Sequence, residues 1–463
     1  MTDPMKPYQD RFESFSRIPE KGRNPEDILT DLSTIADEEA ARHPYAQVSG
    51  TFYHAGPEHR AFLNKVFALF SHVNTIQFDM CPSMAKFESE IIAMTARMLN
   101  GDAVRAANPQ DAVCGTVTSG GTESILMAMK VYRDRARAER GITAPEIVLP
   151  RTAHPAFHKA GEYFGIKRVV VEVGLPDFRV DPNAMAAAIT PNTVALVGSA
   201  GNYPYGLIDP LECLSEIALH HGIGLHVDGC LGGFILPWIE KLGYKVPVFD
   251  FRLPGLTSMS ADTHKYGFGL KGNSVVLYRN SAWRRYQYYA IPDWPGGIYA
   301  SPTAAGSRSG GLSAAAWAAM VYLGEAGYLR IARAIMDLAE EIRRGVASIP
   351  ELIVIGEPTF MVSFRSEAVD IFHVNDFMIT RGWRYNCLQL PPGLHYCVTL
   401  PQTVVPGIAA RMVADLKEAV AYAHAQAGTP ARSSALYGVA GSADGNRMVS
   451  DLLCGVFDYM YGA

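Results

Sequence analysis

The spacing of apolar residues predicts strands that alternate with helices through the middle of the chain. Apolar runs bounded by turn residues predict strands at 112–118, 146–149, 168–173, 194–199, 224–227 and 274–278. Helical spacing recurs between them, at 156–164, 182–188 and 211–221, and after a glycine-containing turn as far as about residue 140. This alternation is typical of a mostly parallel sheet with helices on both faces. We therefore expect an α/β fold, with any ligand beyond the carboxyl ends of the strands.

The flanking regions differ from this middle part. Residues 1–60 are polar and contain several prolines, and Pro25 is well placed to open a short helix, so we expect an N-terminal arm. Residues 61–313 are expected to form a large domain that begins with two helices, at 58–70 and 84–99. Residues 314–463 are expected to form a smaller C-terminal α+β domain with an amphipathic tail. Its predicted elements are an Ala-rich helix at 314–349, broken around 324–327, strands at 352–355, 360–364 and 397–400, and a helix at 408–425.

Composition narrows the class of protein. Of the 463 residues, 48% are hydrophobic and 19% charged, and the net charge is −5, so we expect a globular protein without a nucleic-acid-binding surface. The seven cysteines are scattered without CxxC or Cys/His spacing, which favours reduced thiols, no metal site and a cytoplasmic protein. The first 23 residues lack an apolar signal segment, and no run of about 18 apolar residues occurs, so no transmembrane segment is expected.

The most informative stretch is Ser260-Ala261-Asp262-Thr263-His264-Lys265-Tyr266-Gly267. A lysine is usually solvated at the surface, but this one stands among small polar residues that suit a bound anion. In such a setting a lysine can lose its proton and attack a carbonyl to form a Schiff base. The segment Gly267–Gly272 also matches GxGxxG. It runs directly into a predicted strand instead of opening a helix, so we reject a dinucleotide site.

Three further positions near strand ends supply complementary chemistry. The turn Ser119–Ser124 leads from a strand into a helix, where backbone N–H groups suit a phosphate, although an ordinary connection capped by Thr122 is the alternative. Asp228 follows the strand 224–227 and could pair with a protonated pyridine nitrogen; a helix N-cap or salt bridge would also explain it. His154 could stack on a flat ring or simply be hydrogen-bonded in place. Together these stretches favour pyridoxal 5'-phosphate (PLP) as the carbonyl compound.

The Lys265 stretch resembles the lysine motif of the sphingosine-1-phosphate lyases, which are PLP-dependent fold-type I enzymes near the group II amino-acid decarboxylases. The resemblance covers about residues 45–460 and includes Asp293–Pro302, Ala305–Arg308, Pro391–His395 and Ala435–Gly438. It implies an aspartate aminotransferase-like fold and a homodimer with shared active sites. The implied reaction is retro-aldol cleavage of the C2–C3 bond of sphingosine 1-phosphate to a long-chain aldehyde and phosphoethanolamine. Eukaryotic members carry a membrane helix that this chain lacks, so a soluble, bacterial type is expected.

The resemblance also implies how the cofactor is held. Lys265 would bind PLP covalently, Asp228 would pair with its pyridine nitrogen and His154 would stack on its ring. The residues expected at the cofactor phosphate are Gly121, Thr122 and His264, together with Gly306 and Ser307 of the neighbouring subunit.

Substrate handling is implied in the same way. Tyr53, Gln77 and Lys271 would bind the substrate phosphate. Tyr203 and Tyr299 would lie near the reacting atoms, and either of them, His154 or Lys265 could move a proton; the sequence does not choose among them. Gln77 departs from the family pattern, which has a histidine there, so a neutral amide replaces a chargeable imidazole.

Two other functions compete with the lyase. A group II type amino-acid decarboxylase would share Lys265, Asp228 and His154, but it needs a carboxylate clamp, and no arginine is evident for that role. A catalytically inactive scaffold of the same fold is disfavoured because Lys265, Asp228 and the phosphate turn are all retained.

Overall fold

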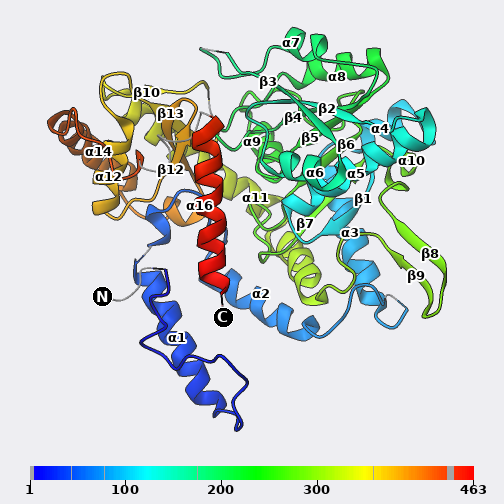
Figure 1. Ribbon diagram of the computed structural model, residues 1–463, viewed down its shortest axis with the longest axis horizontal. Helices are drawn as coiled ribbons and strands as arrows, with labels where there is room; N and C mark the ends of the chain where they lie inside the picture. Colours follow the sequence, from blue (N-terminus) through cyan, green and yellow to red (C-terminus); the bar gives the residue numbers. More distant parts are fainter. Residues whose placement is uncertain are drawn as a thin grey trace.

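The computed structural model describes residues 5–42, 44–77, 79–174, 176–357, 359–434 and 443–462 (Figure 1). Its centre is a seven-stranded sheet in the order β1-β7-β6-β5-β4-β2-β3. The strands are β1 (Cys114–Thr118), β2 (Glu146–Pro150), β3 (Lys167–Val171), β4 (Thr193–Ser199), β5 (Gly224–Asp228), β6 (Ser258–Ala261) and β7 (Ser274–Tyr278). Strand β7 is antiparallel to β1 and β6, and all other neighbours are parallel. The predicted α/β fold with a mostly parallel sheet is confirmed.

Every strand predicted for this sheet forms, and β6 is the one absent from the prediction. Its sequence, Ser258-Met259-Ser260-Ala261, has no β-branched residue and looks like a polar loop. It forms because β5 and β7 pair with it on both sides and bury all four residues. The strand brings the Lys265 stretch to the centre of the sheet.

Helices cover both faces of the sheet and alternate strand residues point into two different cores. On one face, α5 (Gly121–Arg140), α6 (Ala156–Phe164) and the short α10 (Ser281–Arg284) pack against residues such as Val197 and Val276. On the other face, helices pack against residues such as Leu196 and Leu225. These are α3 (Pro82–Met98), α7 (Pro182–Ala187), α8 (Leu211–His221), α9 (Leu236–Lys241) and α11 (Gly310–Ala347).

The N-terminal region contains more helix than its sequence suggested. Helix α1 (Pro25–Arg42) has 18 residues, and none of them is buried within this chain. A 3-10 turn at Tyr45–Gln47, helix α2 (Pro57–Phe70) and, after α3, the short α4 (Asp102–Ala107) follow. In Figure 1, α1 extends away from the rest of the molecule, so the apolar side chains Leu29 and Leu32 are exposed.

Helix α11 connects the large sheet to the C-terminal part. It begins at Gly310 and is interrupted at Gly324, whose φ of 54° and ψ of 179° are not helical, in agreement with the predicted break. The main hydrophobic core is continuous along this helix, from Ala316 beside the large sheet to Val346 beside the C-terminal strands. The boundary at 313/314 therefore crosses a single helix and stays a prediction.

The C-terminal part holds a four-stranded antiparallel sheet in the order β10-β11-β13-β12. Its strands are β10 (Ile353–Val354), β11 (Met361–Arg365), β12 (Asn386–Gln389) and β13 (Pro392–Cys397), and its helices are α12 (Ile371–Thr380), α13 (Leu400–Thr403), α14 (Ile408–Ala425) and α16 (Ala443–Tyr461). The predicted strand at 397–400 is wrong. Thr399 and Gln402 form a capping box that starts α13, so the chain turns into a helix immediately after β13.

A two-stranded hairpin, β8 (Tyr289–Trp294) and β9 (Gly297–Ser301), projects from the body on the side opposite α14 (Figure 1). Its apolar side chains Trp294 and Ile298 are 53% and 86% exposed. Among the described residues, no helix combines the length and apolar character needed to cross a bilayer. The Ala435–Gly438 segment lies outside the described residues.

Candidate active site

The turn from β1 into α5 forms one wall of a cavity of about 360 Å³. Helix α5 begins at Gly121, so the first backbone N–H groups of its 20 residues have no carbonyl partner within the helix. A Cβ at Gly121 would lie 2.7 Å from Oδ1 of Asp262 and 2.8 Å from Sγ of Cys230. Only glycine therefore lets the backbone approach this close, and a phosphate has both the N–H groups and the space it requires.

A network of buried groups fixes the turn. Thr118 and Ser124 hydroxyl oxygens lie 2.6 Å apart, and Ser124 reaches Ser274 on β7 at 2.9 Å. The Glu123 carboxylate accepts a hydrogen bond from the N–H of Ser119 at 2.6 Å and another from the N–H of Ala304 at 2.8 Å. Glu123 therefore ties the turn to the loop that follows β9.

Lys265 lies in the same cavity, directly after β6. Its Nζ is 3.0 Å from Oδ2 of Asp262, whose side chain is 2% exposed. Burial alone would lower the pKa of Lys265, but the Asp262 carboxylate outweighs it and holds this pKa above its usual value. The sequence suggested that Lys265 could lose its proton easily, but the ion pair with Asp262 favours the protonated form. Its ion pair must be displaced before Nζ can act as a nucleophile.

Asp228 ends β5 and is 8% exposed. Its Oδ1 accepts hydrogen bonds from the N–H of Cys230 at 3.0 Å and from the hydroxyl of Ser260 at 3.2 Å. Asp228 therefore neither caps a helix nor forms an ion pair through these bonds, which were the two alternative explanations for an aspartate at this position. The described bonds end on Oδ1, which leaves Oδ2 available for a cationic nitrogen.

Two imidazoles line the cavity. His154 accepts a hydrogen bond from the N–H of Ala156 at its Nδ1, so in its neutral form Nε2 carries the proton. The Nδ1 of His264 lies 2.6 Å from the carbonyl oxygen of Asn273 and donates to it. Burial lowers the pKa of both histidines. Neutral His264 therefore has an unprotonated Nε2, which lies 3.6 Å from Oδ2 of Asp262, and it must gain a proton to donate to a phosphate.

Tyr53 and Lys271 form a second group close to Lys265. The Nζ of Lys271 lies 4.7 Å from the centre of the Tyr53 ring. The Tyr53 ring also packs edge-on against Tyr266, next to Lys265 in sequence. Surrounding protein atoms, and then the charge of Lys265, lower the pKa of Lys271 to about 8, although part of its side chain is exposed.

Tyr203 lies at the edge of this region and is 47% exposed. Its ring is edge-on to His154 with centroids 6.4 Å apart, and edge-on to His395 with centroids 5.0 Å apart. Tyr203 therefore lies beside His154, which lines the same cavity as Lys265.

The remaining predicted residues lie elsewhere in this chain. Gly306, Ser307 and Tyr299 belong to the hairpin and the loop after it, and they are absent from the described lining of the cavity. Gln77 is exposed and belongs to a turn fastened to that same loop. The side-chain amide of Asn74 donates to the hydroxyl of Ser307 at 2.9 Å, and the N–H of Thr75 to the carbonyl of Arg308 at 3.1 Å.

The described residues suit PLP. They include an acid that can pair with a pyridine nitrogen, a lysine that can react with an aldehyde, and a helix N-terminus whose N–H groups can bind a phosphate. Asp262 adds an observation of its own. Its Oδ1 is buried without a hydrogen-bond partner, so the cavity holds an acceptor that the protein alone leaves unsatisfied.

Sequence reasoning did not assign roles to Asp262, Cys230 and Glu123, and all three line the cavity. For Asp262 a signal existed, because it precedes Lys265 by three residues in the same motif. Burial raises the pKa of the Cys230 thiol, which is therefore inert as a nucleophile. The role of Glu123 depends on a loop 181 residues away, and nothing local in the sequence indicates it.

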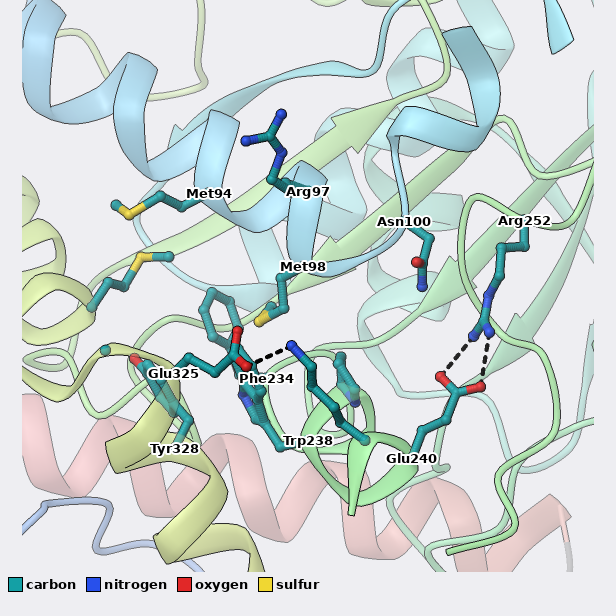
Figure 2. A pocket seen from close by; sticks show the side chains of 14 residues that line it. Met94, Arg97, Met98, Asn100, Phe234, Trp238, Glu240, Arg252, Glu325 and Tyr328 are labelled. Carbon is teal, nitrogen blue, oxygen red and sulfur yellow. Dashed lines mark hydrogen bonds and ion pairs between the residues drawn. The ribbon is translucent and has the colours of Figure 1, made fainter. Parts of the chain in front are cut away.

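A larger cavity of about 650 Å³ lies between α3, α9 and the break in α11, away from these residues (Figure 2). Its lining includes methionine and aromatic side chains such as Met98 and Trp238. The charged groups at its edge are paired: Arg252 binds Glu240 through two hydrogen bonds of 2.8 and 2.9 Å, and Lys241 lies 2.6 Å from Glu325. It contains none of the predicted site residues.

Comparison with known proteins gives consistent results. The family model described as the pyridoxal-dependent decarboxylase conserved domain matches residues 13–367. The chain is 45% identical over 436 residues to the sphingosine-1-phosphate lyase of Oryza sativa subsp. japonica, covering 93% of this chain and 79% of that protein. It is 34% identical over 431 residues to the probable sphingosine-1-phosphate lyase of Legionella pneumophila, covering 87% and 69% respectively.

Solved structures agree with these matches. The sphingosine-1-phosphate lyase of Burkholderia pseudomallei superposes with a TM-score of 0.89 at 51% identity, covering 91% of this chain and 96% of that one. The glutamate decarboxylase of Lactobacillus brevis superposes with a TM-score of 0.75 at 19% identity, which shows the shared fold.

Proposed function

Because the chain belongs to the sphingosine-1-phosphate lyases, within the pyridoxal-dependent decarboxylase family, it is a PLP-dependent carbon–carbon lyase, and we propose that its substrate is a phosphorylated sphingoid base. Cleavage of the C2–C3 bond of sphingosine 1-phosphate would give a long-chain aldehyde and phosphoethanolamine. The observation that carries this proposal is the similarity to named lyases over 93% of the chain. The pairing of Lys271 with Tyr53 close to Lys265 supports it from the geometry.

Six residues of this chain would hold PLP, among them His154, which would stack on its ring. Lys265 would bind it covalently through Nζ after leaving Asp262, and Asp228 would pair with the pyridine nitrogen through Oδ2. The backbone of Gly121 and Thr122 would hold the phosphate, together with protonated His264. When bound, PLP supplies an electron sink that accepts the electron pair of a bond broken at the substrate Cα.

The proposed reaction also needs a base for the C3 hydroxyl and an acid for Cα. His154 carries its proton on Nε2 when neutral, because Nδ1 accepts from Ala156. In that state it can stack on the ring and donate, but it cannot serve as the base. The base would therefore be Tyr203, Tyr299 or Lys265. Of these, Lys265 lines the cavity and Tyr203 lies beside His154.

Tyr53, Lys271 and Gln77 would bind the substrate phosphate. Lys271 supplies a cation below about pH 8, and Tyr53 supplies a hydroxyl. Gln77 lies on the turn that Asn74 joins to Ser307, in the loop that carries Gly306.

A homodimer explains the position of this loop. Gly306, Ser307, Tyr299 and Gln77 are not among the residues that line the cavity of their own chain, and they would complete the site of a second copy. The exposed hairpin residues Trp294 and Ile298 are consistent with burial against such a partner. We propose a cytoplasmic location for the dimer, consistent with seven free cysteines.

The test is to offer the purified enzyme sphingosine 1-phosphate and sphingosine and to measure the aldehyde and the amine products. We expect cleavage of the phosphorylated substrate, with kcat/KM lower by roughly ten- to a hundredfold without the phosphate, since a hydrogen bond to a charged group contributes about 1.5–3 kcal/mol. Equal cleavage of both would refute the phosphate site. Release of CO₂ from aromatic or acidic amino acids, without aldehyde formation, would instead establish a decarboxylase.

A further inference from the structure

Four side chains on neighbouring strands form a polar row inside an otherwise apolar core. The register pairs His226 of β5 with Ser258 of β6, and Asp228 with Ser260. Residues two apart in a strand point to the same face, so all four face α5 and α6. The surrounding core residues include Phe157 and Val276, and His226 itself is fully buried.

These side chains make a continuous hydrogen-bonded row that ends on Asp228. From its far end, the hydroxyl of Tyr132 lies 2.6 Å from Oγ of Ser258, which lies 2.7 Å from Nδ1 of His226. The Nε2 of His226 lies 3.4 Å from Oγ of Ser260, and Ser260 donates to Oδ1 of Asp228 at 3.2 Å. The thiol of Cys230 also donates to Ser260, at 3.2 Å.

The chemistry of the acceptors sets the direction of these bonds. Ser260 has one proton, and a carboxylate accepts it more strongly than a neutral imidazole does. With that proton on Asp228, an unprotonated Nε2 would face the lone pairs of Ser260, so the proton of His226 belongs on Nε2. Its Nδ1 then accepts from Ser258, whose oxygen lies beside the hydroxyl of Tyr132. Burial lowers the pKa of His226 to about 4, so the ring is neutral at the pH of the cytoplasm.

We propose that His226 is a positioning residue of this enzyme: through Ser260 it fixes a hydroxyl donor on Oδ1 of Asp228, and so holds Asp228 with Oδ2 available to the pyridine nitrogen. Removing the donor makes the carboxylate more basic, so the shared proton moves from the pyridine nitrogen towards Asp228. The inference rests on the proposed pairing of Asp228 with PLP.

The proposed test measures whether the pyridine nitrogen of bound PLP is protonated. Holoenzyme is prepared with PLP labelled with ¹⁵N in the pyridine ring, and the ¹⁵N chemical shift reports the ratio of protonated to unprotonated nitrogen. We expect Ser260→Ala to lower this ratio by roughly ten- to a hundredfold, the equivalent of one hydrogen bond to a charged group. His226→Phe should lower it by less, and Ser258→Ala by the least.

A matched control separates positioning from packing. Phe157 contacts the His226 ring edge-on, with centroids 5.6 Å apart, but makes no hydrogen bond through its side chain. Phe157→Leu should reduce thermal stability and leave the ¹⁵N shift unchanged. If His226→Phe does not fold, the two serine variants decide the matter.

The outcomes distinguish two failures. A shift that stays at the protonated value in Asp228→Asn would overturn the proposed pairing with PLP. A shift that moves in Asp228→Asn but stays unchanged in Ser260→Ala and His226→Phe would overturn the role of His226 alone.

Discussion

At the scale of single residues, the two lysines of the site differ in charge state. Lys265 is held protonated by Asp262, 3.0 Å away, whereas the pKa of Lys271 is lowered to about 8. The Asp262 carboxylate thus stabilises the ammonium form of Lys265, whereas Lys271 lies close to its titration range.

The lowered pKa of Lys271 predicts a pH dependence that is specific to phosphorylated substrate. Below about pH 8 Lys271 is cationic and attracts the phosphate, and above it the attraction is lost, so kcat/KM for sphingosine 1-phosphate should fall as the pH rises through this value. Lys271→Arg should remove the fall, since a guanidinium stays charged. The measurement is kcat/KM between about pH 6.5 and 9.5, with sphingosine as the control substrate. An identical fall for sphingosine would assign the titration to another group.

At the scale of elements, the first turn of α5 and the loop after β9 are joined through Glu123. One carboxylate oxygen accepts from Ser119, and the other accepts from Ala304 at 2.8 Å and from Ala305 at 3.4 Å. The turn would hold the cofactor phosphate of its own subunit, and the loop would reach that of the neighbour. In the proposed dimer, Glu123 would therefore couple two segments that serve different active sites.

Glu123→Gln should weaken this coupling, because one amide oxygen cannot accept from both segments and the amide nitrogen would face an N–H. We expect the free energy of unfolding to fall by about 1–3 kcal/mol and the Kd for PLP to rise about tenfold or more. Denaturant unfolding and PLP titration measure the two quantities. Glu139→Gln, at the exposed end of the same helix and paired with Arg135, is the control and should change neither. Unchanged PLP affinity in Glu123→Gln would show that the link has no role in cofactor binding.

At the scale of the whole molecule, two exposed elements support the proposed dimer. The hairpin β8–β9 projects away from the body, and α1 has no buried residue (Figure 1). Both elements expose apolar side chains, such as Leu32 and Ile298, to water. Such exposure is unfavourable in free energy, and a contiguous exposed apolar surface often marks a protein interface. Association of two copies would cover them and bring the loop at 306–307 to a second site.

Shared sites predict that two inactive variants complement each other. Lys265→Ala removes the amine of one site, and Ser307→Trp should block the site of the neighbouring subunit. Each homodimer should be inactive, whereas a mixed dimer retains one intact site, so random mixing should restore about a quarter of the unmodified activity. The assay is aldehyde release after co-expression of the two chains. Lys265→Ala with Asp228→Asn is the control, because both changes fall on residues of the same chain's site and should not complement. Failure of the first pair to recover activity would argue against shared sites.

The sequence by itself determined six of the seven strands of the large sheet and several of the helices that cover it. Apolar runs are sufficient to define buried parallel strands, because such strands are covered on both faces, and helices such as 156–164 and 211–221 form at the predicted residues. The lysine motif, the glycine turn and Asp228 were recognisable because each is a short segment whose residue types suit one function.

Only the tertiary structure decided the features that depend on distant contacts. Strand β6 forms because two neighbours pair with it, not because its polar sequence prefers a strand. The high pKa of Lys265 depends on how the backbone after β6 folds Asp262 back onto it. The row from Tyr132 to Asp228 depends on the register between β5 and β6, which sets His226 beside Ser258. Hydrogen bonds and ion pairs act over a few ångströms in space, and a sequence records only distance along the chain.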